Sequence, residues 1–146
     1  MPTAAKLIGA IAFAALGWAG AWAFMPLMPP ETRWGIFQPV CAALGVLVGW
    51  RFTGARVGRG WIAAMGAGLT GAALLVGLAL LVFSFREMVH RSMNFRYDGP
   101  LDAVVNVFGI VLEYGVLLWD TLFLSVLVLG GLLGGLLAEA AARLWR

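Results

Sequence analysis

Residues 85–120 read FREMVHRSMNFRYDGPLDAVVNVFGIVLEYGVLLWD, and the rest of the chain is organised around this stretch. It holds the single histidine and five of the seven carboxylates, whereas the sequence on either side is almost unbroken hydrocarbon. The five carboxylates are Glu87, Asp98, Asp102, Glu113 and Asp120. A membrane tolerates polar groups at depth only where they are paired or face protein or water. We therefore expect this stretch to lie at the membrane edge or against other protein.

The composition is that of an integral membrane protein. Of the 146 residues, 62% are hydrophobic and only 12% are charged, and the mean hydropathy is +0.95. Soluble domains carry about 25% charged residues, so too little polar surface is present to cover a water-soluble globule. A β-barrel would show segments of about ten alternating residues, whereas the apolar runs here are continuous. We predict one all-α membrane domain covering residues 1–146, with no nucleic-acid partner.

Four apolar runs are long enough to cross the hydrocarbon core, which needs about 20 residues of helix. The predicted transmembrane helices lie at about 5–25, 34–52, 61–83 and 121–142. Cleavage of the first run as a signal peptide is an alternative, because Ala-Trp-Ala at residues 21–23 fits a small-x-small cleavage pattern. The length of that run and its two tryptophans favour a retained span.

Between the third and fourth spans, residues 84–119 are predicted to form an amphipathic, interfacial helical hairpin that turns at residues 97–100. In its second half, four residues recur at spacings of four, three and four, which places them within about 60° on a helix. They are Asp102, Asn106, Gly109 and Glu113. A fifth span over residues 101–119 would place Glu113 in the bilayer, which costs roughly 3 kcal/mol if the carboxylate is unpaired. We predict instead that this segment does not cross, and that Asp120 caps the last helix.

Glu113 and Tyr114 are the sharpest candidates for a polar site. A carboxylate among Val, Leu and Phe should be paired, protonated or facing water. The candidate polar network comprises Glu113, Tyr114, Asp102, Asn106, Arg86, Arg91 and Arg96. Structural pairing of Glu113 with one of these arginines is the first interpretation, and proton or ion handling is the second. The sequence contains no nucleotide-binding loop, nucleophile–base pair or paired acidic metal site, so no catalytic residue, metal or cofactor is predicted.

A basic turn separates the second and third runs. Arg51, Arg56 and Arg59 lie in RFTGARVGRG, residues 51–60, together with three glycines. Guanidinium groups suit oxyanions and anionic lipid head groups, and a purely topological anchor is the interpretation that we favour. Placing this turn and both termini in the cytoplasm puts six of the ten basic residues there, as the positive-inside rule expects. Six of the seven tryptophans lie at proposed span ends, which is typical of an aromatic belt.

Glycines spaced four apart predict close packing of helices. The predicted packing residues are Gly45, Gly49, Gly130, Gly131, Gly134 and Gly135. Small residues at this spacing let helix backbones approach, but the spacing does not say whether the partner is another span or another chain. Cys41 is the only cysteine, so no intrachain disulfide forms, and we predict a buried, apolar-like residue. His90 is interpreted as a solvated residue on a polar face rather than as a proton switch.

Four short motifs stand in order along the chain: PTAAK at 2–6, VGWR at 48–51 with the Gly- and Arg-rich turn after it, RYDGP at 96–100 and EYG at 113–115. Together they resemble the TrgA family, small alpha-proteobacterial membrane proteins named for tellurite resistance. The resemblance runs the length of the chain. It implies a non-enzymatic, multi-pass protein of the bacterial inner membrane that supports tellurite tolerance directly or through a partner. It brings no defined catalytic or binding residues.

Two other classes of function fit the same features. One is a structural or assembly subunit that docks on a larger membrane complex through its glycine faces. The other is a small transporter or channel built as a homo-oligomer, because four spans leave little room for a pore within one chain. Beyond the lipid bilayer itself, the sequence identifies no partner.

Overall fold

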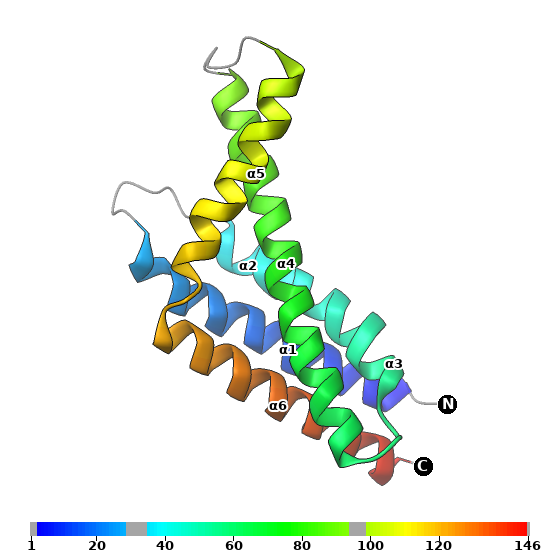
Figure 1. Cartoon of the computed structure of the whole chain (residues 1–146). Helices are drawn as coiled ribbons and strands as arrows, with labels where there is room; N and C mark the ends of the chain where they lie inside the picture. Colours follow the sequence, from blue (N-terminus) through cyan, green and yellow to red (C-terminus); the bar gives the residue numbers. More distant parts are fainter. Residues whose placement is uncertain (1–2, 29–34, 94–98, 146) are drawn as a thin grey trace.

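The computed structural model describes residues 3–28, 35–93 and 99–145, and this part of the chain is helical, without strands (Figure 1). Its elements are α1 (Thr3–Phe24), the 3₁₀-helix η1 (Met25–Leu27), α2 (Phe37–Val48), the π-helix η2 (Gly49–Thr53), α3 (Gly54–Arg56), α4 (Trp61–Met93), α5 (Pro100–Leu117) and α6 (Thr121–Leu144). The all-α prediction is therefore confirmed.

Three helical segments are long and apolar enough to cross a membrane: Thr3–Leu27, Trp61–His90 and Thr121–Leu144. They correspond to the first, third and fourth predicted spans. The second predicted span, at 34–52, is divided differently, because α2 has only 12 residues and runs on into the π-helix. Taken alone, α2 extends about 18 Å, which is shorter than the hydrocarbon core.

The backbones of α1 and α2 touch because glycine leaves no side chain between them. A Cβ atom added to Gly45 would overlap the carbonyl oxygen of Phe13. A Cβ atom added to Gly49 would likewise overlap the carbonyl oxygen of Gly9. Any larger residue at either glycine would push the two helices apart. Both predicted packing glycines of this region therefore meet a helix of the same chain.

A second glycine contact joins α4 to α6. A Cβ atom on Gly68 would overlap the carbonyl oxygen of Gly131, and one on Gly135 would overlap the carbonyl oxygen of Ala64. The face of α6 formed by Gly131 and Gly135 is thus occupied within the chain, by α4. For these glycines, the packing partner is therefore another helix of the same chain.

Phe13 connects these two helix pairs. Its ring is fully buried, and it lies between α4 and α6. A Cβ atom on Gly71 of α4 would stand 2.9 Å from the ring, and one on Gly134 of α6 would stand 3.0 Å from it. Leu16, one turn further along α1, covers Gly130. The glycines of α4 and α6 thereby form the space that holds the largest buried side chain of α1.

At the other end of the bundle, aromatic rings fill the interior. The Phe24 ring stacks on Phe37 with centroids 6.1 Å apart and meets Phe123 edge-on at 5.6 Å. Phe37 also contacts Phe83 of α4 at 4.4 Å. Such pairs stabilise a core by about 0.5–1.5 kcal/mol beyond their buried area. Cys41 is buried beside them, as predicted.

α4 is longer than the predicted third span. The sequence between residues 78 and 93 contains neither glycine nor proline, so the helix continues past residue 83 to Met93, although the side chains become polar. Its 33 residues extend about 50 Å. α5 lies alongside the C-terminal half of α4 (Figure 1). The tight turn predicted at residues 97–100 falls partly outside the described residues, since only Gly99 and Pro100 are placed.

The start of α6 is defined by Asp120. Its Oδ2 accepts hydrogen bonds from the backbone N–H groups of Leu122 at 3.0 Å and Phe123 at 3.2 Å. These N–H groups have no partner within the helix, so the side chain satisfies donors that would otherwise be unpaired near hydrocarbon. The predicted N-cap is confirmed.

Candidate functional site

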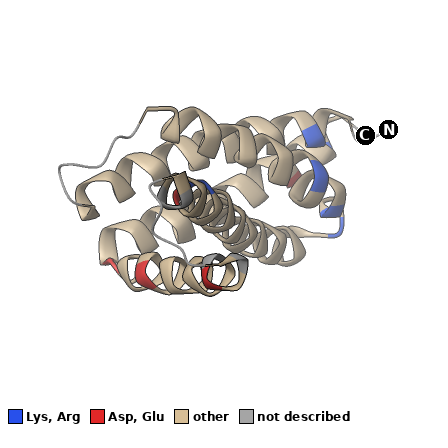
Figure 2. Cartoon of the chain, turned by 90° about the horizontal axis from the view of Figure 1, so that it is seen from above, with Lys and Arg blue, Asp and Glu red and all other residues tan. Residues whose placement is uncertain are grey.

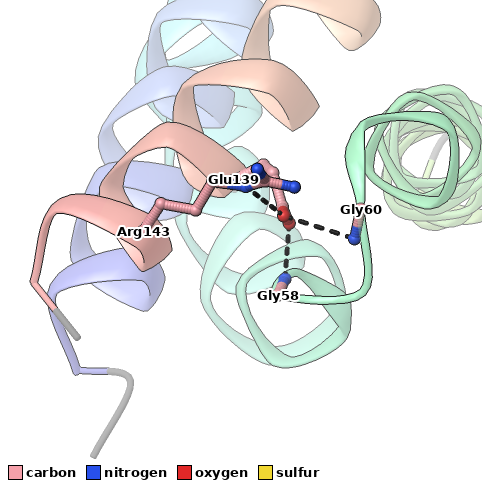
Figure 3. A network of polar contacts seen from close by, with 4 residues as sticks. All are labelled: Gly58, Gly60, Glu139 and Arg143. Carbon is pink, nitrogen blue, oxygen red and sulfur yellow. Dashed lines mark hydrogen bonds and ion pairs between the residues drawn. The ribbon is translucent and has the colours of Figure 1, made fainter.

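The best-defined polar site of the described structure surrounds Glu139 on α6. Its side chain is only 1% exposed, yet both carboxylate oxygens have donors (Figure 3). Oε2 accepts from the backbone N–H of Gly58, and Oε1 accepts from that of Gly60 at 3.3 Å. Oε1 also accepts from Nε of Arg143 at 3.1 Å. A buried charge with this many hydrogen bonds avoids most of the penalty of leaving water.

The turn before α4 is shaped to present these two N–H groups. Gly58 has φ of 94° and Gly60 has φ of 117°, a left-handed region that glycine occupies without a steric penalty. The carbonyl of Gly60 accepts from the N–H of Ala64, so Gly60 marks the beginning of α4. A carboxylate at this position also faces the positive end of the helix dipole. Glu139 therefore joins α6 to the turn that precedes α4.

Arg143 extends the network to the first residue of α4. It follows Glu139 by four residues on α6, which is the favourable order for an acidic and a basic residue. Its guanidinium carbon lies 4.8 Å from the ring centroid of Trp61, a cation–π contact. Because the Arg143 side chain is 51% exposed, solvent weakens its ion pair. The hydrogen bonds from the Gly58 and Gly60 N–H groups are less exposed to solvent than this ion pair.

Sequence reasoning did not single out Glu139, which stands where the last apolar run ends. The signal present in the sequence was a Glu–Arg pair four residues apart at the end of an apolar helix. Its partners lie 81 and 79 residues away in the chain, so a single sequence could not identify them.

The predicted basic turn lies at the same end of the bundle. Arg51, Arg56 and Arg59 are all exposed, and Figure 2 shows most of the lysine and arginine that it colours near the chain termini. The guanidinium carbon of Arg56 stands 3.6 Å from the centroid of the Phe52 ring. The backbone of Lys6 lies against Gly54, which brings a fourth cation to this region.

The structure describes only part of the predicted polar network. We expected the polar stripe of α5 to face the basic residues of the preceding segment, but Asp102 and Glu113 are exposed. The buried position of α5 is Ile110, with 1% exposure, because an apolar side chain packs against α4 at no desolvation cost. Asn106 and Tyr114 are half-buried.

Arg86 is exposed, and no ion pair joins it to Glu113 in the described structure. The Arg91 side chain and the whole of Arg96 lie outside the described residues, so pairing of Glu113 with either stays a prediction. His90 is exposed, in keeping with its place on a polar face.

An apolar cavity of about 60 Å³ lies near the aromatic end of the bundle, lined by residues of α1, α2, α4, α5 and α6. The lining includes the predicted candidates Cys41 and Tyr114, and otherwise hydrocarbon side chains and glycine. Among the residues that the structure describes, no three His, Cys, Asp or Glu side chains gather to hold a metal ion.

Within the described ranges, the geometry defines a helical protein with three helices able to cross a membrane and one buried carboxylate whose two oxygens both accept hydrogen bonds. No family model matches the chain, and neither a curated protein nor a solved structure matches it.

Proposed function

We propose that this chain is a non-enzymatic, multi-pass inner-membrane protein of the TrgA type that supports tellurite resistance directly or through a partner. The tellurite part rests on the four sequence motifs. The membrane part rests on one structural observation: the three long apolar helices carry large hydrophobic side chains on their outer surfaces. In water these surfaces would be unstable, whereas lipid covers them without cost.

A fourth crossing belongs to this proposal. α2, the π-helix and α3 follow one another without a break over residues 37–56, twenty helical residues that extend about 30 Å. The start of α1 and the end of α6 lie at the same end of the bundle (Figure 1), which suits an even number of crossings. With the basic turn beside them, this end is the cytoplasmic one by the positive-inside rule.

An interfacial position of α5 also belongs to this proposal. Six large apolar side chains of this segment are exposed and recur at spacings of three or four: Leu101, Val105, Phe108, Leu112, Val116 and Trp119. Asp102 and Glu113 lie on an adjacent face. A helix with this division places its apolar side in the bilayer surface and its acidic side in water.

Growth on tellurite tests the functional proposal. Deletion of the gene should lower the tellurite concentration that the bacterium tolerates, and a plasmid copy should restore it. Tolerance of peroxide, measured in the same strains, is the control for a general envelope defect. Equal tellurite tolerance with and without the gene would contradict the proposal, as would an equal loss of peroxide tolerance.

A second candidate function is that of an assembly subunit on a larger membrane complex. The glycines predicted for that contact are occupied within the chain. A different face of α4 is unoccupied: Gly66, Thr70 and Ala73 are exposed, and nothing lies within 4 Å of a Cβ atom added to Gly66 or Gly77. Small residues at this spacing accept a further transmembrane helix.

Co-purification in mild detergent tests the second candidate. If a partner helix packs on this face, Gly66→Leu should release the partner. The matched control is Leu78→Ala, an exposed residue of the same helix on a different side from Gly66 and Ala73. Equal recovery of the partner with both variants would exclude this face as the contact.

A further inference from the structure

The end of the bundle that holds Glu139 carries more positive charge than its own carboxylate neutralises. Arg143 is paired with Glu139, and the two oxygens of Glu139 are also occupied by Gly58 and Gly60. Four further cations among the described residues lie at this end: Lys6, Arg51, Arg56 and Arg59. No ion pair links any of them to a carboxylate in the part of the chain that the structure describes.

The π-helix and its aromatic residues position two of these cations. In η2, the N–H of Gly54 donates to the carbonyl oxygen of Gly49, five residues earlier, so the turn is wider than an α-helical one. Side chains five residues apart, such as Arg51 and Arg56, therefore lie closer to one face than they would on an α-helix. The Phe52 ring supports the Arg56 guanidinium from one side, which limits its freedom before any ligand binds.

The same surface borders the hydrocarbon. Trp50 is 44% exposed and lies in η2, and Trp61 is 46% exposed and begins α4. Exposed indole rings near span ends occupy the membrane–water interface. Ile62, next to Trp61, is 87% exposed. A group bound to the arginines would thus have phosphate-binding donors on one side and apolar side chains on the other.

We propose that Arg51, Arg56, Arg59 and Lys6 form a binding surface for the phosphate group of an anionic phospholipid. Guanidinium groups offer paired donors to phosphate oxygens, and the adjacent tryptophans and Ile62 contact the acyl chains. Water and salt screen the attraction between a small free oxyanion and exposed guanidinium groups, so such an anion binds weakly there, and these three arginines are all exposed. The open, lipid-bordered position favours the head group of a bilayer lipid.

The inference is independent of the role in tellurite tolerance. It depends only on the location of this end of the bundle at an anionic membrane surface. Each basic residue near such a surface strengthens lipid binding about fivefold, so three arginines together contribute roughly a hundredfold.

Native mass spectrometry of the full-length protein in detergent tests the proposal, with equal amounts of phosphatidylglycerol and phosphatidylcholine as probes. The wild type should retain phosphatidylglycerol preferentially. Arg59→Gln should lower that preference about fivefold. This arginine lies in the exposed turn and makes no contact that supports the fold, so the variant should remain folded. The triple variant Arg51→Gln, Arg56→Gln, Arg59→Gln should lose the preference.

Arg86→Gln is the matched control, because Arg86 is exposed on α4 beyond the predicted third span, and it should retain phosphatidylglycerol like the wild type. Millimolar inorganic phosphate should displace no more lipid than sodium chloride of equal ionic strength. Equal retention of the two lipids by the wild type would overturn the proposal, and so would equal retention of phosphatidylglycerol by Arg59→Gln and Arg86→Gln. Specific displacement by inorganic phosphate would assign the surface to a free anion instead.

Discussion

Replacing Glu139 by alanine tests whether its carboxylate joins α6 to the start of α4. The substitution removes the acceptor of two backbone N–H groups, from Gly58 and Gly60, and frees Arg143. A buried donor left without its partner costs about 1–3 kcal/mol. The turn is partly exposed, so water recovers some of this loss, and Arg143 at 51% exposure can turn to solvent. We expect a net loss of about 2–4 kcal/mol.

Thermal unfolding of the purified protein in detergent measures this loss. For a chain of this size, 1 kcal/mol corresponds to about 2–4 °C in Tm, so Glu139→Ala should lower Tm by roughly 10 °C. Glu139→Gln keeps one carbonyl acceptor and should lower Tm by less. Asp102→Asn is the control, because that carboxylate is exposed on α5, and it should change Tm by about 1 °C or less. Equal Tm values for Glu139→Ala and Asp102→Asn would refute the reasoning.

Three further predictions follow from the fold. Gly135→Leu should lower Tm by roughly 5 °C or more, because a side chain at this position overlaps the α4 backbone. Leu133→Ala on the exposed face should have little effect on Tm, and similar losses of Tm for the two variants would contradict the packing of α6 on α4. Asp120→Ala should lower the free energy of unfolding by about 1 kcal/mol, and Asp120→Asn should lower it less, as measured by the same thermal unfolding. An unchanged Tm for Asp120→Ala would show that the cap does not stabilise the protein. Alkaline phosphatase fused after Arg146 should be inactive and fused at residues 99–100 active, and an active C-terminal fusion would exclude four crossings.

The apolar runs predicted most of the helices because helix formation in a membrane is a local requirement. Without water, every backbone N–H and C=O must bond within its own segment, so a long apolar run becomes a helix whatever surrounds it. Residues 121–142 were predicted as the last span, and α6 covers Thr121–Leu144. The Asp120 cap could also be predicted from local sequence, because the acceptor and its donors are close together in the chain.

The internal structure of the second run was not predictable in this way. The hydrogen bond that closes the π turn joins Gly49 and Gly54, and both glycines lie against the backbone of α1. Which turn these residues adopt therefore depends on a helix some 40 residues away in the sequence. The change from apolar to polar side chains after residue 83 marks a change of environment, and we interpreted it as the end of the span and the start of an amphipathic helical segment. The structure shows one continuous helix, α4, through both.

The acidic residues of the stretch 85–120 and Glu139 differ in burial, because burial of a carboxylate depends on hydrogen-bond donors rather than on the number of polar residues nearby. The stretch 85–120 concentrates acidic side chains, yet Asp102 and Glu113 are exposed. Glu139 stands alone in an apolar helix and is nevertheless buried, because two glycines with positive φ turn their N–H groups toward it. A charge enters a low-dielectric interior only where hydrogen bonds replace its water. In this bundle those bonds come from backbone that glycine alone can shape, so the position of the buried charge is set by Gly58 and Gly60 as much as by Glu139 itself.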